Sequence, residues 1–264
     1  MMGTGLKPVA ARLARRMGLR RSAGRDYEAR VERFYSRILS PGDVCVDVGA
    51  HSGRHTFPMS RVVGPSRRVF AFEPLPLVRA ALFESLKSSG LDGMVTLSAA
   101  ALSDFTGRST FVVAEDAPEE SGLRERTYNV PTATKRIDVD VMTLDGALPS
   151  DISAVRYIKI DCEGAEWSVL RGAAGTIDRL RPLISFEFGE AAYGAYGTDP
   201  AEVHRFFAGR DYVVLDILGR QLDEAAFSTS SVRQKLWDYV AVPSTSARLA
   251  GRALKARWFV TART

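Results

Sequence analysis

Along the first forty residues, apolar side chains recur every three or four positions, which is the period of an amphipathic helix. The turn-forming sequence Pro41-Gly42-Asp43 interrupts this pattern. We therefore expect an N-terminal helical extension over residues 1–40. Its apolar positions are Leu6, Val9, Leu13 and Met17, followed by Tyr27, Val31, Phe34, Tyr35 and Leu39.

From residue 44 onward, short apolar runs alternate with helical patterns. Such runs between helices are typical of parallel strands that are buried on both faces. The expected strands are 44–48, 68–73, 94–100, 155–161, 182–188, 212–217 and 236–242, and the expected helices are 53–62, 76–89, 164–180 and 199–208. This rhythm predicts an α/β fold over residues 41–244: a Rossmann-like sheet of about seven strands with helices on both faces.

Residues 104–145 do not follow this alternation of strands and helices. STFVVA and RIDVDVMTL alternate apolar and polar positions on either side of a loop rich in Pro, Glu and Ser, from about 115 to 134. Alternation of this kind is typical of strands with one solvated face. We expect two antiparallel strands that flank a mobile insertion.

The length of 264 residues and a hydrophobic content of 45% fit one large domain with helical extensions. Cys45 and Cys162 are the two cysteines, both at or beside expected strands, which is no disulfide framework. A reducing cytoplasm is therefore the expected location. No run approaches the roughly 18 apolar residues of a membrane span, and the N-terminus lacks the apolar core of a signal peptide.

The net charge of +5 is concentrated near the two ends of the chain, and residues 245–264 are expected to form a basic C-terminal helix. Such arms can contact nucleic acid, an anionic membrane or an acidic partner, or they can be solvated amphipathic helices. The sequence leaves these alternatives open, and it leaves homo-oligomer formation open as well. The basic positions are Lys7, Arg12, Arg15, Arg16, Arg20 and Arg21, then Arg248, Arg252, Lys255, Arg257 and Arg263.

The loop DVGAHSG, residues 47–53, follows the first expected strand. A dinucleotide loop has the spacing G-x-G-x-x-G, but here Gly49 and Gly53 stand without the middle glycine, and Asp47 would repel a pyrophosphate. No Gly-Lys-Ser/Thr follows, which excludes a phosphate-binding loop of the Walker type. S-adenosylmethionine fits better, because it has no phosphate and carries an ammonium and a sulfonium.

Glu73 ends the second expected strand, 24 residues after Gly49 (73 − 49 = 24). A carboxylate at this place can accept hydrogen bonds from both ribose hydroxyls. Taken separately, Asp47 could cap the next helix and Glu73 could lie in a solvated turn before Pro74; together they favour the cofactor. The expected cofactor contacts are Asp47, Gly49, Ala50, His51, Gly53, Glu73, Pro74 and Ala100.

Five segments between residues 43 and 190 resemble the FkbM-type methyltransferase family: VDVGAHSG, VFAFEPLP, ALSD, YIKIDCEGAEWSVLRGA and RPLISFEFGE. The resemblance implies an S-adenosylmethionine-dependent O-methyltransferase with the seven-stranded sheet of class I methyltransferases. It also implies a hydroxyl acceptor on a saccharide, or on a glycosylated or polyketide-type metabolite. His51 is a departure, since family members usually have asparagine there.

Three carboxylates are the candidates for catalysis. Asp161 and Glu187 end strands that are expected to be adjacent, and Glu163 begins the loop after Asp161. Methyl transfer to a hydroxyl needs alignment and removal of a proton. Either one carboxylate is the general base, or Asp161 and Glu187 bind a magnesium ion that acidifies the hydroxyl. The structural alternative is that Asp161 and Glu163 cap the next helix, supported by Glu166.

Other residues carry weaker signals. His55 and His204 are single histidines of the kind that usually pack or lie on the surface, and five aromatic side chains could stack on sugars or pack in the core. Two other function classes are considered. One is a non-catalytic nucleic-acid-binding protein that uses the basic arms, and the other is a nicotinamide dehydrogenase, which the glycine spacing disfavours. The aromatic residues are Tyr128, Trp167, Tyr193, Tyr196 and Trp237.

Overall fold

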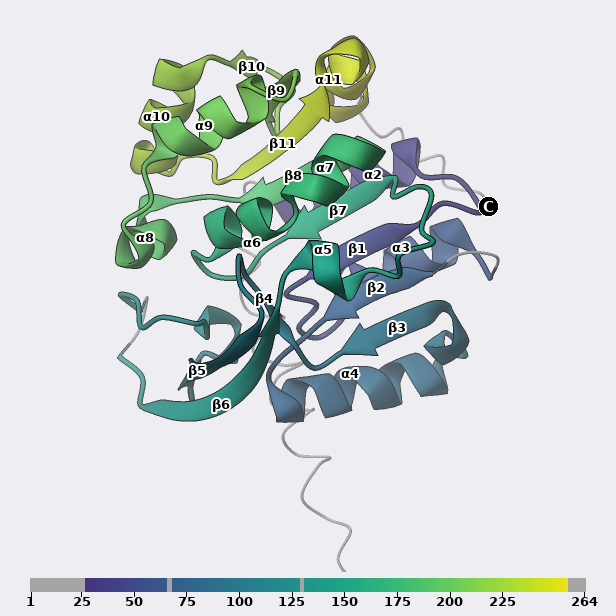
Figure 1. The fold of residues 1–264 in the computed structure, drawn as a ribbon, viewed down its shortest axis with the longest axis vertical. Helices are drawn as coiled ribbons and strands as arrows, with labels where there is room; N and C mark the ends of the chain where they lie inside the picture. Colours follow the sequence, from purple (N-terminus) through teal and green to yellow (C-terminus); the bar gives the residue numbers. More distant parts are fainter. Residues whose placement is uncertain (1–26, 66–67, 129–130, 256–264) are drawn as a thin grey trace, which may run out of the picture.

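The computed structural model describes residues 27–65, 68–128 and 131–255 (Figure 1). The predicted helical pattern before Tyr27 and the end of the predicted C-terminal helix lie outside these residues. The strands of the main sheet are β1 (Cys45–Val48), β2 (Val69–Phe72), β3 (Val95–Ser98), β7 (Tyr157–Ile160), β8 (Leu183–Glu187), β9 (Tyr212–Asp216), β10 (Gln221–Leu222) and β11 (Asp238–Pro243).

The strand order is β10-β9-β11-β8-β7-β1-β2-β3. Strands β3, β2, β1, β7 and β8 are parallel neighbours, and β11 inserts antiparallel between β8 and β9. A Rossmann-like sheet with this single antiparallel insertion is the class I methyltransferase sheet, so the predicted fold is confirmed. All seven expected strands form. The eighth, β10, has only two residues and therefore no readable pattern.

Helices cover both faces of the sheet (Figure 1). The expected helix over 164–180 is divided at Ala173 into two helices. Just before the division, Gly172 packs so closely against the Ser103 carbonyl that a Cβ would lie 2.0 Å from its oxygen. The helices are α2 (Tyr27–Ile38), α3 (Thr56–Val63), α4 (Pro76–Ser88), α5 (Leu144–Ala147), α6 (Glu166–Gly172), α7 (Ala174–Leu180), α8 (Glu190–Tyr193), α9 (Pro200–Ala208), α10 (Glu224–Arg233) and α11 (Ala247–Lys255), with short 3-10 turns η1 (Asp92–Met94), η2 (Pro118–Glu120), η3 (Gly194–Tyr196) and η4 (Ser244–Ser246).

Successive strand residues point to opposite faces, so two separate layers pack on the sheet. One face packs with α5, α6, α7, α9 and α10, through residues such as Val46, Ile158 and Phe186. The other face packs with α2, α3 and α11, through residues such as Cys45 and Tyr157. Helix α2 is therefore part of the same hydrophobic core as the sheet.

A second, three-stranded sheet holds the insertion. Its strands are β4 (Ala101–Leu102), β5 (Gly107–Ala114) and β6 (Thr134–Met142). Strands β5 and β6 pair antiparallel along their whole length, as predicted, and β4 pairs parallel with β6. Figure 1 shows this sheet and α8 on the side toward which the arrows of β1, β2, β3 and β7 point. The insertion therefore lies at the carboxyl ends of the parallel strands, where open α/β sheets bind their ligands.

Candidate active site

The loop after β1 is pressed against the loop after β7. Gly49 has a φ of +78°, and a Cβ added to it would lie 1.8 Å from the Asp161 carbonyl oxygen. The amides of Gly49 and Ala50 both donate to the Phe72 carbonyl of β2, at 3.1 and 3.0 Å. Only glycine fits this position. The close approach brings the expected cofactor loop and the expected catalytic loop together.

Asp47 is buried, with 1% of its surface exposed. Its Oδ2 accepts a hydrogen bond of 2.6 Å from Thr56 Oγ1 at the start of α3, while Oδ1 is buried without a hydrogen-bond partner among the described residues. Burial raises the pKa of Asp47, and the Lys159 ammonium opposes that shift. One oxygen thus supports the helix, and the other is left for a cationic or hydrogen-bond-donating ligand.

Glu73 is also buried, and each of its carboxylate oxygens accepts a hydrogen bond from a backbone amide. Oε2 accepts from the His51 amide and Oε1 from the Leu75 amide, both at 2.8 Å. Burial raises the pKa of Glu73 to about 7, although both amides lower it. Each carboxylate oxygen can accept a further hydrogen bond, so two hydroxyls can still be bound.

The other residues expected at the cofactor lie around these two carboxylates. His51 has a φ of +45°, and burial lowers the pKa of its ring, whose Nε2 is buried without a partner among the described residues. Gly53 has a φ of +85° and packs against Phe57. Two further expected contacts flank the ends of β2 and β3. The Pro74 carbonyl accepts a hydrogen bond from the Arg79 guanidinium. Ala100 is buried, and its amide donates a hydrogen bond to Ser98 Oγ.

The strand register places the predicted catalytic carboxylates on one face of the sheet. Asp47 pairs with Lys159, which pairs with Ser185, so these residues share one row. Asp161 lies two residues after Lys159, and Glu187 lies two residues after Ser185. Because side chains alternate along a strand, both point to the same face as that row. This is the face that packs against α2 and α3.

Asp238 joins these residues from the antiparallel strand. It is the register partner of Glu187 in the β8–β11 ladder, and directly opposite side chains on one face are neighbours. Burial raises the pKa of both carboxyls, and the Asp161 carboxylate raises both further. Neither side chain has a hydrogen bond to another described residue. The sequence could not reveal Asp238, because the β11 register is not readable from its pattern.

Lys159 is a buried cation among these carboxylates. Its Nζ donates to Asp161 Oδ2 at 2.8 Å. Burial lowers the pKa of Lys159, but the Asp161 and Asp47 carboxylates raise it by more, so the net shift is upward. The ammonium therefore persists and neutralises Asp161.

The expected magnesium site does not fit this arrangement. Asp161 and Glu187 were its predicted ligands, but Asp161 Oδ2 already binds the Lys159 ammonium. Within residues 27–65, 68–128 and 131–255, no group of three or more His, Cys, Asp or Glu side chains could hold a metal ion.

Glu163, the third predicted catalytic carboxylate, turns toward the insertion. Its φ is +56°, and it forms an ion pair with Arg126, whose side chain is 8% exposed. The Arg124 amide donates to Tyr196 Oη at 3.1 Å, and its guanidinium to the Ala195 carbonyl at 3.3 Å. The insertion, expected to be mobile, is thus bound to the loop after β7 and to η3. Glu163 is engaged in holding it.

Glu166 supports the loop, in agreement with the structural interpretation. It is buried, and its Oε1 accepts from the amides of Cys162 and Gly164 at 2.9 and 3.2 Å. Burial raises the pKa of Glu166 to about 7. The two cysteines, Cys45 and Cys162, form no disulfide.

The two remaining histidines have structural partners. His55 is buried, and its Nδ1 lies 3.2 Å from Tyr35 Oη. His204 Nε2 lies 3.2 Å from the Leu222 carbonyl. Both contacts support the packing interpretation of these side chains.

The aromatic side chains differ in what they can still bind. Tyr193 stacks on Phe188 in the core with ring centroids 4.2 Å apart, and Trp167 packs edge-on against Phe206. Trp237 is 39% exposed, beside Asp238, with its ring against Tyr27 of α2. Trp237 therefore keeps part of its ring exposed next to Asp238 in the chain.

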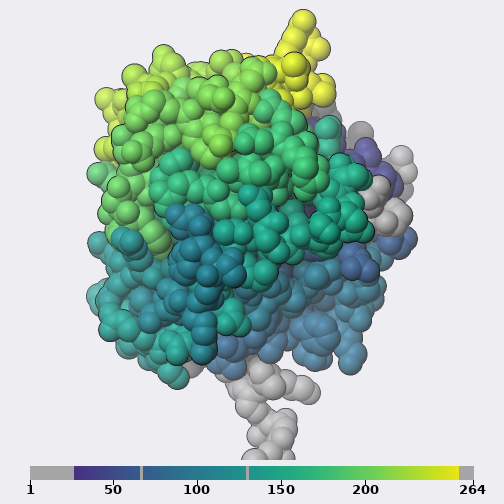
Figure 2. All heavy atoms as spheres, in the orientation of Figure 1, coloured from purple at the N-terminus to yellow at the C-terminus, as the bar shows by residue number. Residues whose placement is uncertain are grey.

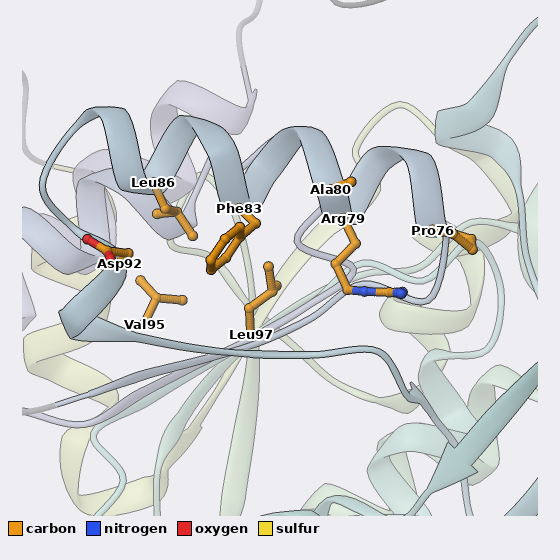
Figure 3. Close-up of a pocket in the computed structure, with 8 residues that line it drawn as sticks. All are labelled: Pro76, Arg79, Ala80, Phe83, Leu86, Asp92, Val95 and Leu97. Carbon is orange, nitrogen blue, oxygen red and sulfur yellow. The ribbon is translucent and has the colours of Figure 1, made fainter. Parts of the chain in front are cut away.

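A hollow of about 340 Å³ lies elsewhere, between α4 and the edge strand β3 (Figure 3). Its walls are formed by Pro76, Arg79, Ala80, Phe83, Leu86, Asp92, Val95 and Leu97. None of the residues expected to bind cofactor or to act in catalysis lines it.

A family model described as the methyltransferase FkbM domain matches residues 47–214. The chain belongs to this family. The match begins at Asp47 and includes Glu73, Asp161 and Glu187, so it contains the carboxyl ends of β1, β2, β7 and β8, whereas Asp238 of β11 lies outside it. The FkbM assignment made from sequence is confirmed.

Among related proteins, the chain is 28% identical over 162 residues to Methyltransferase 1 of Beauveria bassiana (strain ARSEF 2860), which covers 54% of this chain and 63% of that protein. Two solved structures are also similar. The methyltransferase FkbM of Methylobacillus flagellatus KT matches with 16% identity and a TM-score of 0.47, over 83% of this chain and 55% of that one. The O-methyltransferase TomG of Streptomyces achromogenes matches with 13% identity and a TM-score of 0.49, over 92% and 91%.

Helices long and apolar enough to cross a bilayer do not occur in the part of the chain that the structure describes.

Proposed function

We propose that this FkbM-family protein transfers the methyl group of S-adenosylmethionine to a hydroxyl of a saccharide, or of a glycosylated or polyketide-type metabolite. The observation that carries the proposal is the row of carboxylates on one sheet face, directly beside the glycine loop. Asp47 and Glu73 serve the cofactor, and Glu187 with Asp238 serves the acceptor. The Beauveria relative is named a methyltransferase and TomG an O-methyltransferase, which agrees with this reaction class.

The cofactor half of the site has the chemistry that S-adenosylmethionine requires. The buried Oδ1 of Asp47 has no partner among the described residues, so it can accept a hydrogen bond from the ammonium. Glu73 can accept hydrogen bonds from the ribose hydroxyls, since each of its oxygens has unused acceptor capacity. Bound in this way, the cofactor supplies an electrophilic methyl group on a sulfonium.

Glu187 is the proposed general base. Held by Asp47 and Glu73, S-adenosylmethionine would supply its methyl group to the acceptor oxygen and would leave as S-adenosylhomocysteine, and Glu187 would accept the proton of the hydroxyl. The raised pKa of Glu187, caused mainly by burial and then by Asp161, makes it a better proton acceptor than an ordinary carboxylate. Asp161 and Glu163 are less suited, because Lys159 and Arg126 already bind them.

A sugar acceptor is supported by the side chains that remain available around Glu187. Carboxylates accept hydrogen bonds from hydroxyl groups, and the partly exposed Trp237 offers a flat apolar ring next to Asp238. Magnesium has no part in this mechanism, since the Lys159 ammonium takes the cation position at Asp161.

The first test is calorimetric titration of the full chain with S-adenosylmethionine and, separately, with NAD. We expect binding of the first alone, followed by transfer of labelled methyl from it to members of a sugar panel. Chelation by EDTA should leave the transfer unchanged. Binding of NAD in place of S-adenosylmethionine would reject the proposal, and loss of transfer on chelation with recovery in magnesium would reject its mechanism.

A further inference from the structure

Helix α11 has a basic face that is exposed on the outside of the molecule. Arg248, Arg252 and Lys255 are spaced by four and three residues, so they lie on one side of the helix. All three are exposed, and none forms an ion pair with another described residue. The opposite side of the helix is packed down by Ala250 and Leu254. Figure 2 shows the yellow C-terminal helix projecting beyond the rest of the molecule.

The neighbouring turn between β9 and β10 extends this surface. Gly219 packs so closely on α11 that a Cβ would lie 2.8 Å from the Gly251 carbonyl oxygen. Beside it, Leu218 is 41% exposed, and the side chain of Arg220 is 70% exposed. The Arg220 guanidinium is paired with Asp216 at 3.3 Å, so the turn adds mainly its exposed leucine to this edge, and the unpaired cations are those of α11.

Exposed leucines accompany the cations on both elements. Leu249 on α11 is 64% exposed, and Leu218 lies in the adjoining turn. On α11 itself no acidic residue can neutralise the cations, since residues 239–264 contain no Asp or Glu, whereas Arg220 of the turn is paired with Asp216 at 3.3 Å. A basic helix face with apolar residues at its border is the pattern of a segment that lies in the interface of an anionic bilayer.

We propose that this surface, formed by Arg248, Leu249, Arg252 and Lys255 of α11 with Leu218 and Arg220, binds an anionic lipid membrane. The cations attract the headgroups, and the two leucines enter the boundary between headgroups and acyl chains. A nucleic acid would satisfy the cations but would leave both leucines in water. The exposed leucines therefore favour the membrane. This inference is independent of the proposed methyl transfer.

The test uses the full chain and sedimentation with vesicles of phosphatidylcholine, with or without phosphatidylglycerol. We expect binding only to the anionic vesicles, and weaker binding at higher salt. Each cation contributes about fivefold to the affinity, so Arg248→Gln, Arg252→Gln and Lys255→Gln combined should weaken binding by about a hundredfold. The matched control is Lys87→Gln, Arg108→Gln and Lys135→Gln, three exposed cations elsewhere, which should bind like the wild type.

A second variant separates the membrane from a nucleic acid. Leu249→Ser with Leu218→Ser keeps every charge, and we expect it to weaken vesicle binding while the thermal unfolding curve stays unchanged. Equal binding of the triple variant and the wild type would overturn the proposal. So would tight binding to duplex DNA together with vesicle binding that is insensitive to the leucine substitutions. Cofactor binding is measured separately, so failure of the proposed methyl transfer would remain distinguishable.

Discussion

Glu187 and Asp238 lie directly opposite each other in the antiparallel β8–β11 ladder, with their side chains on the face that carries Asp47 and Lys159. Two carboxyls in this relationship repel when both are ionised. The raised pKa of each, due first to burial and then to Asp161, means that the pair retains a proton more readily than exposed carboxyls do.

Substitution of Glu187 should separate chemistry from cofactor binding. We expect Glu187→Gln to lower kcat by about 10²–10⁴-fold, the usual contribution of a general base. Its affinity for S-adenosylmethionine should remain, because Asp47 and Glu73 are unchanged. Turnover assays and calorimetry on the same preparation give both values. Equal losses of binding and turnover would argue against the assigned roles.

Asp238→Asn should shift the pH dependence of the same reaction. Removal of the opposite charge lowers the pKa of Glu187, so the base is ionised at lower pH. The rising limb of the plot of kcat/KM against pH should therefore move to lower pH. Ser185→Ala, a substitution in the neighbouring row that leaves charge unchanged, is the control. An unmoved limb in Asp238→Asn would mean that the pair does not set the proton affinity of the base.

Asp47→Asn tests the charge of the cofactor loop. Asparagine keeps an oxygen that can accept from Thr56 but loses the negative charge, and a hydrogen bond to a charged group contributes about 1.5–3 kcal/mol. We expect a loss of affinity for S-adenosylmethionine of about 10- to 100-fold in calorimetry. Thr56→Val is the matched control, since it removes the Thr56 hydrogen bond and leaves the carboxylate. A similar loss in both variants would show that helix support is the role of Asp47.

The Glu73 carboxyl should make cofactor binding dependent on pH. Its pKa of about 7 leaves a large protonated fraction at neutral pH, and the ionised form accepts the ribose hydroxyls better. Affinity for S-adenosylmethionine should therefore rise as the pH increases through 7. In Glu73→Gln this dependence should disappear, and its persistence there would assign it to another group.

The pH dependence of protein stability, measured without cofactor, is an independent check of the raised pKa of Glu73. The folded pKa of Glu73 is raised above its usual value of 4.5, so its contribution to the unfolding free energy is fully present below pH 4.5. That contribution is lost as the pH rises toward 7. We expect urea unfolding to give similar free energies of unfolding for the wild type and Glu73→Gln at low pH. As the pH rises toward 7, the free energy of unfolding of the wild type should fall below that of the variant.

The Arg126–Glu163 ion pair should hold the insertion in place. Both side chains are largely buried, at 8% and 18% exposed, so removal of one leaves the other charge without compensation. We expect Arg126→Met to cost about 3–5 kcal/mol, and the double variant with Glu163→Gln to cost less than the sum. Urea unfolding of the four proteins gives the coupling energy. Additive losses would show that the contact contributes little.

The parts of the fold that were predicted correctly have periodic patterns of their own. The runs that became β1 and β7 are apolar throughout because both faces are buried, and α4 keeps its helical period. Glu73 could be identified from local sequence, because its place at the end of a strand follows from the strand itself.

The remaining features depend on relationships between distant segments. Asp238 could not be found, because its place opposite Glu187 is set by the β11 register. The ion pair of Glu163 could not be found either, because the left-handed φ of Glu163 turns the chain and Arg126 comes from an insertion 37 residues earlier. The contact of Lys159 with Asp161 could not be read from the sequence, since it depends on side-chain conformation.

The contact between Gly49 and the Asp161 carbonyl also limits how this protein could be redesigned. The loops after β1 and β7 contact each other through backbone atoms, with no side chain between them. A side chain added at Gly49, or a shift of either loop, would therefore move the other loop. Attempts to broaden the range of acceptors should leave both loops intact. Libraries are better directed at exposed positions of the insertion between β5 and β6, with Arg124 and Arg126 kept, because these two residues bind the insertion to η3 and to the loop after β7.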